Sequence, residues 1–166
     1  MRFHARTMDL AAALTDAVTE AVTRVFSTMA SVKTVRSEAV DLSQAAHDSL
    51  NEVTGSVSFV GAVTGTLYLS LPPTFCRLVT QQILGGDGLT DREENDVVGE
   101  LTNMVTGNLK TAMANKGYNS QLSIPSVLRG ESLTLSCKGF TSVIGLTFQA
   151  PDLKESFQVR VMGKVD

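Results

Sequence analysis

The chain has 166 residues, a length that suits one domain and allows a buried hydrophobic core. Its formal net charge is only −3 at pH 7 and it has no basic run, so the sequence gives no reason to expect a nucleic-acid partner. Tryptophan is absent and 5% of the residues are aromatic, which argues against a stacking platform for bases or sugars. We expect a single domain that spans residues 1–166.

The cysteines and the apolar segments indicate a soluble protein of the cytoplasm. Cys76 and Cys137 are far apart and lack metal-ligand spacing. They are therefore predicted to be buried thiols in a reducing compartment rather than a disulfide, a nucleophile or a metal site. The uncharged run of residues 53–76 contains several glycines and two prolines, which favours a hairpin followed by a loop over a membrane span. Charges at the amino terminus make it a poor signal peptide.

The amino-terminal part of the chain predicts one long helix. Apolar residues recur at helical spacing through residues 8–29, and the segment is rich in alanine. Residues 31–40 favour a short strand, whereas residues 41–50 favour a helical turn or a loop.

A hairpin and a second helix are predicted to follow. Apolar and polar residues alternate through residues 55–73, as in an antiparallel hairpin, and Gly61 and Gly65 are expected to flank its turn. Two prolines end the second strand and open a helix over residues 72–84, because proline suits the first turn of a helix. Residues 85–88, Gly-Gly-Asp-Gly, are interpreted as a linker and not as a phosphate-binding loop, since the lysine and hydroxyl residue of such a loop are missing.

The second half predicts a long helix and then strands. Thr90 and Glu93 have the spacing of a capping box, and Gly117 is a plausible helix end. Four short strand-like segments with turns between them follow, and the alternation in the last, residues 156–165, is typical of a strand with one face in water. The order of elements predicts an α+β fold: an antiparallel sheet with the long helices packed on one face.

The predicted long helix carries an unusual polar stripe. Its apolar residues form one face, whereas Asp96, Glu100, Asn103, Gly107 and Lys110 fall on roughly the opposite arc. A solvated face is the ordinary explanation of such a pattern. However, asparagine and glycine are poor helix formers, and together with Gly99 they cost about 2 kcal/mol relative to alanine. A glycine beside the stripe would also let another surface approach closely, so a partner or chemical role is the alternative.

Asn108 lies near the centre of the apolar face of the same helix. A buried amide needs hydrogen-bond partners. We therefore predict a structural role for Asn108, in which its amide ties the helix to a neighbouring backbone.

The sequence around the stripe resembles a known family. Asp96, Glu100 and Asn103 match the D/S-x3-E-x2-N signature of the CheC/CheX/FliY chemotaxis phosphatases. The flanking "VGELTNMVTGNLKTAM", the hairpin "GSVSFVGAVTGTLYLSLP" and the segment "LSIPSVLRG" resemble CheX-like members in the same order. The resemblance extends from about residue 8 to the end of the chain.

This resemblance implies a phosphatase that removes the phosphoryl group from the aspartyl phosphate of a CheY-like receiver domain. It implies that Asn103 orients a water for in-line attack and that Glu100 pairs with the active-site lysine of the receiver. The Mg²⁺ ion belongs to the receiver, so the chain needs no cofactor or metal of its own. Asp96, Gly107 and Lys110 are the candidate partner-binding residues. Asp96 could instead support Glu100 or Lys110, Gly107 could serve only as clearance, and Lys110 could simply be solvated. The resemblance also implies a homodimer joined through its sheets.

An amide suits this task. Phosphoryl transfer requires positioning and charge neutralisation more than covalent help, and an amide can accept a water proton and donate to a phosphoryl oxygen without titrating. Two alternatives remain open at this point. The chain could be a non-catalytic adaptor for a receiver or for the flagellar switch, or a structural dimer whose stripe only faces solvent.

The predicted first helix contains a second copy of the spacing. Asp16, Glu20 and Thr23 are placed as the three signature residues are, but the copy ends in threonine. A hydroxyl is shorter than an amide and lacks its paired donor and acceptor. We interpret this copy as a coincidence or as a vestige without activity. A single active signature is typical of CheX-like members.

Overall fold

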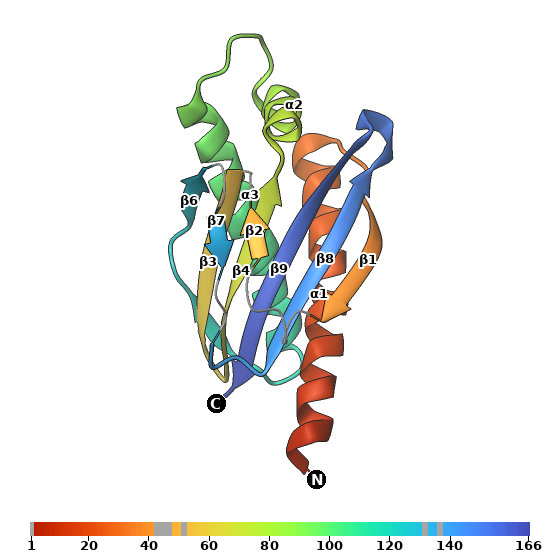
Figure 1. Ribbon diagram of the computed structural model, residues 1–166, viewed down its shortest axis with the longest axis vertical. Helices are drawn as coiled ribbons and strands as arrows, with labels where there is room; N and C mark the ends of the chain where they lie inside the picture. The colour runs from red at the N-terminus through yellow and green to blue at the C-terminus, as the bar shows by residue number, and fades with distance from the viewer. Residues whose placement is uncertain (1, 42–47, 51–52, 131–132, 136–137) are drawn as a thin grey trace.

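The computed structural model of the chain describes residues 2–41, 48–50, 53–130, 133–135 and 138–166. These residues form three α-helices, a short 3-10 helix (Pro151–Leu153), a main sheet of antiparallel strands and a small second sheet (Figure 1). In chain order the elements are α1 (Arg2–Ala30), β1 (Val35–Asp41), β2 (Asp48–Leu50), β3 (Val53–Gly61), β4 (Val63–Leu71), α2 (Pro73–Leu84), α3 (Asp91–Ala114), β5 (Ser120–Leu122), β6 (Ser126–Arg129), β7 (Leu133–Leu135), β8 (Ser142–Ala150) and β9 (Glu155–Val165).

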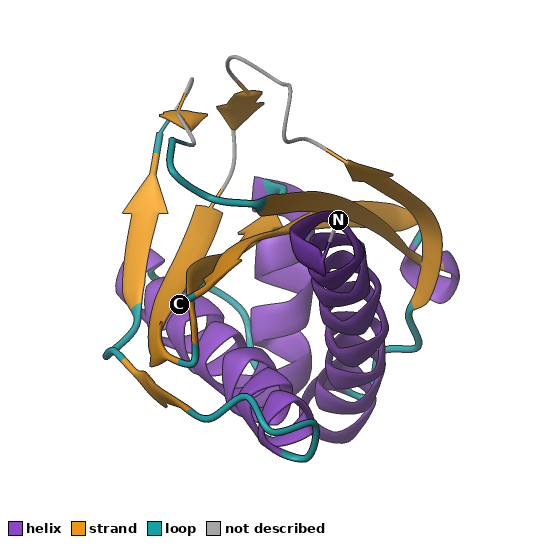
Figure 2. Cartoon of the chain, turned by 90° about the horizontal axis from the view of Figure 1, so that it is seen from below, coloured by secondary structure: helices purple, strands orange, loops and turns teal. Residues whose placement is uncertain are grey.

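The main sheet has seven strands in the order β1-β8-β9-β4-β3-β5, and β6 also pairs with β3. The strand pairs are antiparallel, and β2 and β7 form a separate two-stranded sheet. The long helices α1 and α3 lie side by side on one face of the main sheet (Figure 2). This confirms the predicted α+β fold.

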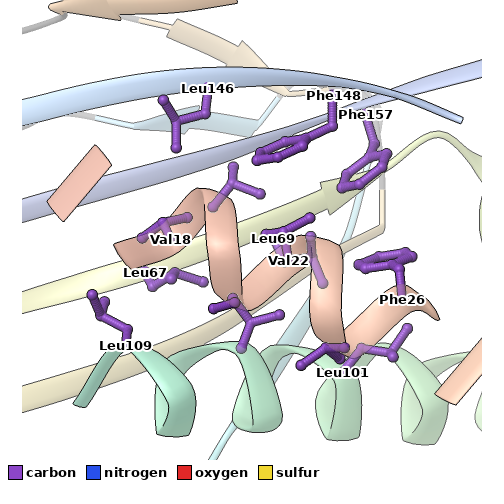
Figure 3. Packing of buried hydrophobic residues seen from close by; sticks show 14 of the residues in the cluster. Val18, Val22, Phe26, Leu67, Leu69, Leu101, Leu109, Leu146, Phe148 and Phe157 are labelled. Atoms are coloured by element: carbon purple, nitrogen blue, oxygen red, sulfur yellow. The ribbon is translucent and has the colours of Figure 1, made fainter. Parts of the chain in front are cut away.

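The hydrophobic core lies between the helices and the main sheet. Apolar side chains from both long helices meet those of the central strands there (Figure 3). Four phenylalanine rings stack in this layer: Phe26, Phe75, Phe148 and Phe157. Burial of these side chains fixes α1 and α3 on the sheet with their outer faces exposed.

A close contact sets the position of α3 on the sheet. A Cβ on Gly55 of β3 would lie 2.0 Å from Oγ1 of Thr102, so only glycine lets α3 approach this strand. Thr102 in turn donates to the carbonyl of Val98 within the helix, at 2.6 Å. The signature helix therefore lies against β3 with little room for another arrangement.

The start of α3 follows the sequence prediction, whereas the helix is capped at Asn115 and not at the predicted Gly117. Thr90 accepts from the backbone N–H of Glu93, and the Glu93 carboxylate accepts from the backbone N–H of Thr90, which completes the capping box. The backbone N–H and the hydroxyl of Thr90 both donate to this carboxylate, and these two hydrogen bonds lower the pKa of Glu93. The helix ends at Ala114, and Gly117 follows in the left-handed conformation with φ +87°.

Some predicted boundaries were wrong. The first helix begins at Arg2 rather than near residue 8. Gly65 lies inside β4 and not beside the turn. Glycine is required there because a Cβ would meet the carbonyl of Met162 on β9. In the segment predicted as a helical turn or loop, Asp48–Leu50 forms a strand paired with β7, whereas residues 42–47 lie outside the described residues.

The outer face of β9 is not uniformly exposed to solvent, in contrast to the prediction. Arg160 lies on that face, yet only 7% of its surface is exposed. Its Nη2 donates to Oε1 of Gln158 at 2.7 Å. Hydropathy alternation alone placed this arginine in water, but the tertiary structure covers it.

The described helices include none that is long and apolar enough to cross a membrane.

Candidate functional site

The polar stripe lies on the outer face of α3. Asp96, Glu100 and Lys110 are exposed, and Asn103 and Gly107 are half-buried. The opposite face of the helix buries Val98, Leu101, Val105 and Leu109 in the core. The helical projection of the sequence therefore predicted both faces correctly, and one helix brings all five candidate residues together.

The side chains of the stripe have no partner within the described part of the chain. None of the hydrogen bonds and ion pairs found there involves the side chain of Asp96, Glu100, Asn103 or Lys110. An amide and a carboxylate that satisfy no internal hydrogen bond are free to pair with a second molecule. The arrangement can thus present one acceptor-only group and one donor–acceptor group, a helical turn apart, to a docked partner.

Gly107 extends the stripe without adding bulk. A Cβ built on Gly107 would have no atom within 4 Å. The fold itself therefore does not require glycine at this position, in contrast to Gly55. Clearance for an approaching surface remains a physical reason for a residue that weakens the helix.

An ion-pair cluster, which the sequence analysis missed, holds the start of α3. Glu94 is almost fully buried, and its two carboxylate oxygens contact two arginines. Nε of Arg77 on α2 lies 3.2 Å from Oε1, and Nη2 of Arg129 on β6 lies 2.7 Å from Oε2. Arg129 also donates to the side chain of Asn95. We call Arg77, Glu94 and Arg129 the arginine clamp.

The clamp had a signal in the sequence. Glu94 lies four residues before Val98 and seven before Leu101, which places an acid on the core-facing arc of the helix. A buried carboxylate requires paired cations. Which arginines pair with it depends on the tertiary structure, because Arg77 and Arg129 belong to other elements.

The hydrogen-bond partner predicted for Asn108, a neighbouring backbone, was wrong. Asn108 is half-buried, and its Nδ2 donates to the carbonyl of Met104 in the same helix, at 2.9 Å. It lines a hollow between α1 and α3 together with Glu20 and Arg24 of α1. The gap between the two helices lets the amide bond to its own backbone instead of a neighbouring one.

The signature-like copy on α1 differs from the signature on α3 in its hydrogen bonds. Oγ1 of Thr23 donates to the carbonyl of Thr19 at 2.8 Å, and Glu20 lies 3.7 Å from Arg24. Asp16, Glu20 and Thr23 line a shallow hollow that Arg36 borders. The hydroxyl that would replace the signature amide is thus bonded to its own helix, unlike Asn103 on α3.

Cys76 is buried on α2, as predicted, whereas Cys137 lies outside the described residues. Burial and, as a smaller cause, the nearby Glu94 carboxylate raise the pKa of the Cys76 thiol from 9.0 to about 11. Such a thiol is a poor nucleophile. Among the described residues, no group of three or more His, Cys, Asp or Glu residues is placed to hold a metal ion.

Comparison with known families identifies the chain. A family model described as chemotaxis phosphatase CheX matches residues 53–149, more than half of the sequence. The chain belongs to the CheX family. The match covers the hairpin, α2, α3 and the strands up to β8 and thus includes the stripe. No curated protein matches the sequence.

Solved CheX structures share the fold. CheX from Vibrio vulnificus is 25% identical, with a TM-score of 0.77 over 91% of this chain and 99% of that one. CheX from Desulfovibrio desulfuricans is 24% identical, with a TM-score of 0.80 over 91% of this chain and 99% of that one. CheX of Borrelia burgdorferi, solved as a complex with CheY, BeF3 and Mg²⁺, is 20% identical, with a TM-score of 0.72 over 90% of this chain and 96% of that one.

Proposed function

We propose that this CheX-family chain hydrolyses the aspartyl phosphate of a CheY-like receiver domain in chemotaxis or a related two-component pathway. One observation carries the proposal: α3 presents Glu100 and Asn103, without internal partners in the described structure, on the exposed face of a family-matched helix. The Borrelia CheX–CheY complex supports the choice of partner, because a fold relative binds a receiver with BeF3 and Mg²⁺ present.

The chemistry asked of the chain is modest. Water attacks the phosphorus in line, the bond between phosphorus and the aspartate oxygen breaks, and inorganic phosphate and the free carboxylate are the products. The Asn103 amide oxygen accepts a hydrogen bond from that water, and its NH₂ group donates to a phosphoryl oxygen. The amide acts by positioning, as the water-orienting glutamine of GTPases does.

Glu100 has a different task. Its carboxylate, one helical turn from Asn103, pairs with the active-site lysine of the receiver. This pair fixes how far the Asn103 amide enters the active site of the receiver. Asp96 and Lys110 contact the receiver at the two ends of the stripe, and Gly107 gives clearance. The Mg²⁺ ion that neutralises phosphoryl charge belongs to the receiver, so this chain supplies no metal ligand.

The test is the decay of acyl phosphate on a CheY-like receiver from the same organism. Decay is followed with Mg²⁺, with and without the protein at one tenth of the receiver concentration. Turnover of more than one receiver per protein molecule supports a phosphatase. Binding without faster decay would contradict it and would indicate an adaptor instead.

A further inference from the structure

Ile124 is the most exposed of the large hydrophobic side chains in the described structure. It lies in the connection between β5 and β6, with 86% of its surface in contact with solvent. Single exposed apolar residues are common on protein surfaces and need no explanation by themselves. The position of Ile124 and the rigidity of its backbone distinguish it.

The backbone on both sides of Ile124 is anchored to β3. The N–H of Ser123 donates to the carbonyl of Ser58 at 2.8 Å, and the N–H of Ser58 donates to Oγ of Ser123 at 3.0 Å. Ser123 Oγ also donates to the carbonyl of Ile124 at 3.0 Å. Pro125 restricts the residue before it to extended conformations. The exposed side chain is therefore held on a backbone with little freedom left to lose on binding.

The connection lies beside the stripe. A Cβ built on Gly99 of α3 would be 4.0 Å from Cβ of Pro125 and 3.5 Å from Val127, so this segment borders α3 on the Gly99 side. Asn103 follows Gly99 by one helical turn on that same side, a spacing of about 6 Å. Ile124 is adjacent to Pro125 in the chain, about 3.8 Å between Cα atoms. These contacts place the connection that carries Ile124 along the Gly99 side of the stripe.

We propose that Ile124 is an apolar contact for the receiver domain and is covered by the same surface that the stripe of α3 binds. This inference rests on the proposed function. It adds a requirement of its own: the receiver must present an apolar area next to its phosphorylated aspartate, facing Ile124. An exposed apolar side chain that a partner covers completely is a common source of affinity.

The inference assigns Ile124 to binding and not to catalysis. The side chain carries no group that could orient water or stabilise charge. Its burial should be the same in the ground state and in the transition state, so its removal should weaken complex formation and leave the rate in the complex unchanged.

The experiment compares Ile124→Ala, Ile124→Lys and Val35→Ala with the unchanged protein. Val35 is a matched control, because it is also an exposed branched apolar residue but begins β1, at the opposite edge of the sheet from β5. Affinity is measured by titration against the receiver loaded with Mg²⁺ and beryllium fluoride. The rate in the complex is measured as acyl phosphate decay with the protein in saturating excess.

We expect the Kd of Ile124→Ala to rise about tenfold, or about 1.4 kcal/mol, and that of Ile124→Lys to rise further. Val35→Ala should bind within about twofold of the unchanged protein, and the saturated decay rate of Ile124→Ala should be unchanged. Because Ile124 is exposed in the free chain, its variants should unfold at the same urea concentration as the unchanged protein.

Failure of the role of Ile124 and failure of the proposed phosphatase function would give different results in these measurements. Equal affinity for all four proteins would overturn the role of Ile124, even if decay is accelerated. If Ile124→Ala loses affinity but the unchanged protein does not accelerate acyl phosphate decay, the phosphatase proposal is overturned and the receiver contact of Ile124 is supported. No binding of the loaded receiver by the unchanged protein would overturn both.

Discussion

Nη2 of Arg129 lies 2.7 Å from Oε2 of Glu94 and joins the last residue of β6 to the first turns of α3. The carboxylate is almost fully buried, whereas the guanidinium is partly exposed. The same carboxylate contacts Arg77 of α2, so three elements meet at one charge. The first signature residue, Asp96, lies two residues further along α3, and the clamp therefore fixes the end of the helix from which the stripe begins.

Arg129→Met should destabilise the fold. The substitution leaves a buried carboxylate with only Arg77, which is itself well exposed. Removal of one partner of a buried ion pair typically costs about 3 to 5 kcal/mol of stability. Because Arg77 remains, the free energy of unfolding should fall by about 3 kcal/mol. Urea unfolding measures it. The exposed pair of Arg24 and Glu20 supplies the control: Arg24→Met should cost less than about 1 kcal/mol. Equal losses in the two variants would contradict the clamp.

Gly107→Ala should separate stability from binding. The new methyl group meets no atom within 4 Å, and alanine is about 1 kcal/mol better than glycine in a helix interior. The midpoint of urea unfolding should therefore rise. The same methyl group would occupy the clearance beside the stripe, so affinity for the loaded receiver should fall.

Thr23→Ala is the matched control for Gly107→Ala. Thr23 is exposed on α1, in the signature-like copy, and its hydroxyl bonds only to its own helix among the described contacts. The substitution should also favour the helix, yet leave receiver binding and decay unchanged. A loss of activity in Thr23→Ala would show that the copy on α1 has a role. Unchanged receiver binding in Gly107→Ala would rule out clearance for the receiver as the role of Gly107.

Cys76 should react slowly with thiol reagents even at pH 9 in the folded chain. Its pKa of about 11 means that the folded chain holds almost no thiolate at pH 9, where a thiol of pKa 9.0 is half ionised. A Cys137→Ser background isolates the Cys76 signal. The rate of modification by a disulfide reagent should be low at pH 9 and reach that of a free thiol only in denaturing urea. Rapid modification of the folded chain at pH 9 would contradict the burial of this thiol.

Local signals in the sequence predicted much of the fold. The capping box at Thr90, the prolines at the start of α2 and the alternation in β3 and β4 all depend on neighbours in the chain, and the structure confirms each one. The two faces of α3 were predictable for the same reason, because a projection needs only the helix period.

Features that depend on distant segments were not predictable in this way. Gly65 is required by β9, Arg160 is covered by tertiary structure, and Glu94 takes its arginines from α2 and β6. Asn108 bonds to its own helix because α1 leaves a hollow there. The roles of the stripe residues and the homodimer depend on a second molecule and stay predictions.

The most direct measurement compares Asn103→Ala with Asn108→Ala. The two residues have the same side chain in the same helix, but Asn103 belongs to the stripe and Asn108 faces the hollow beside α1. Acyl phosphate decay and affinity for the beryllium fluoride-loaded receiver are measured for both. The account predicts that Asn103→Ala binds the receiver but loses the acceleration, about 100-fold or more, as for removal of a preorganised positioning group. Asn108→Ala should keep it. Undiminished decay with Asn103→Ala would contradict the central claim.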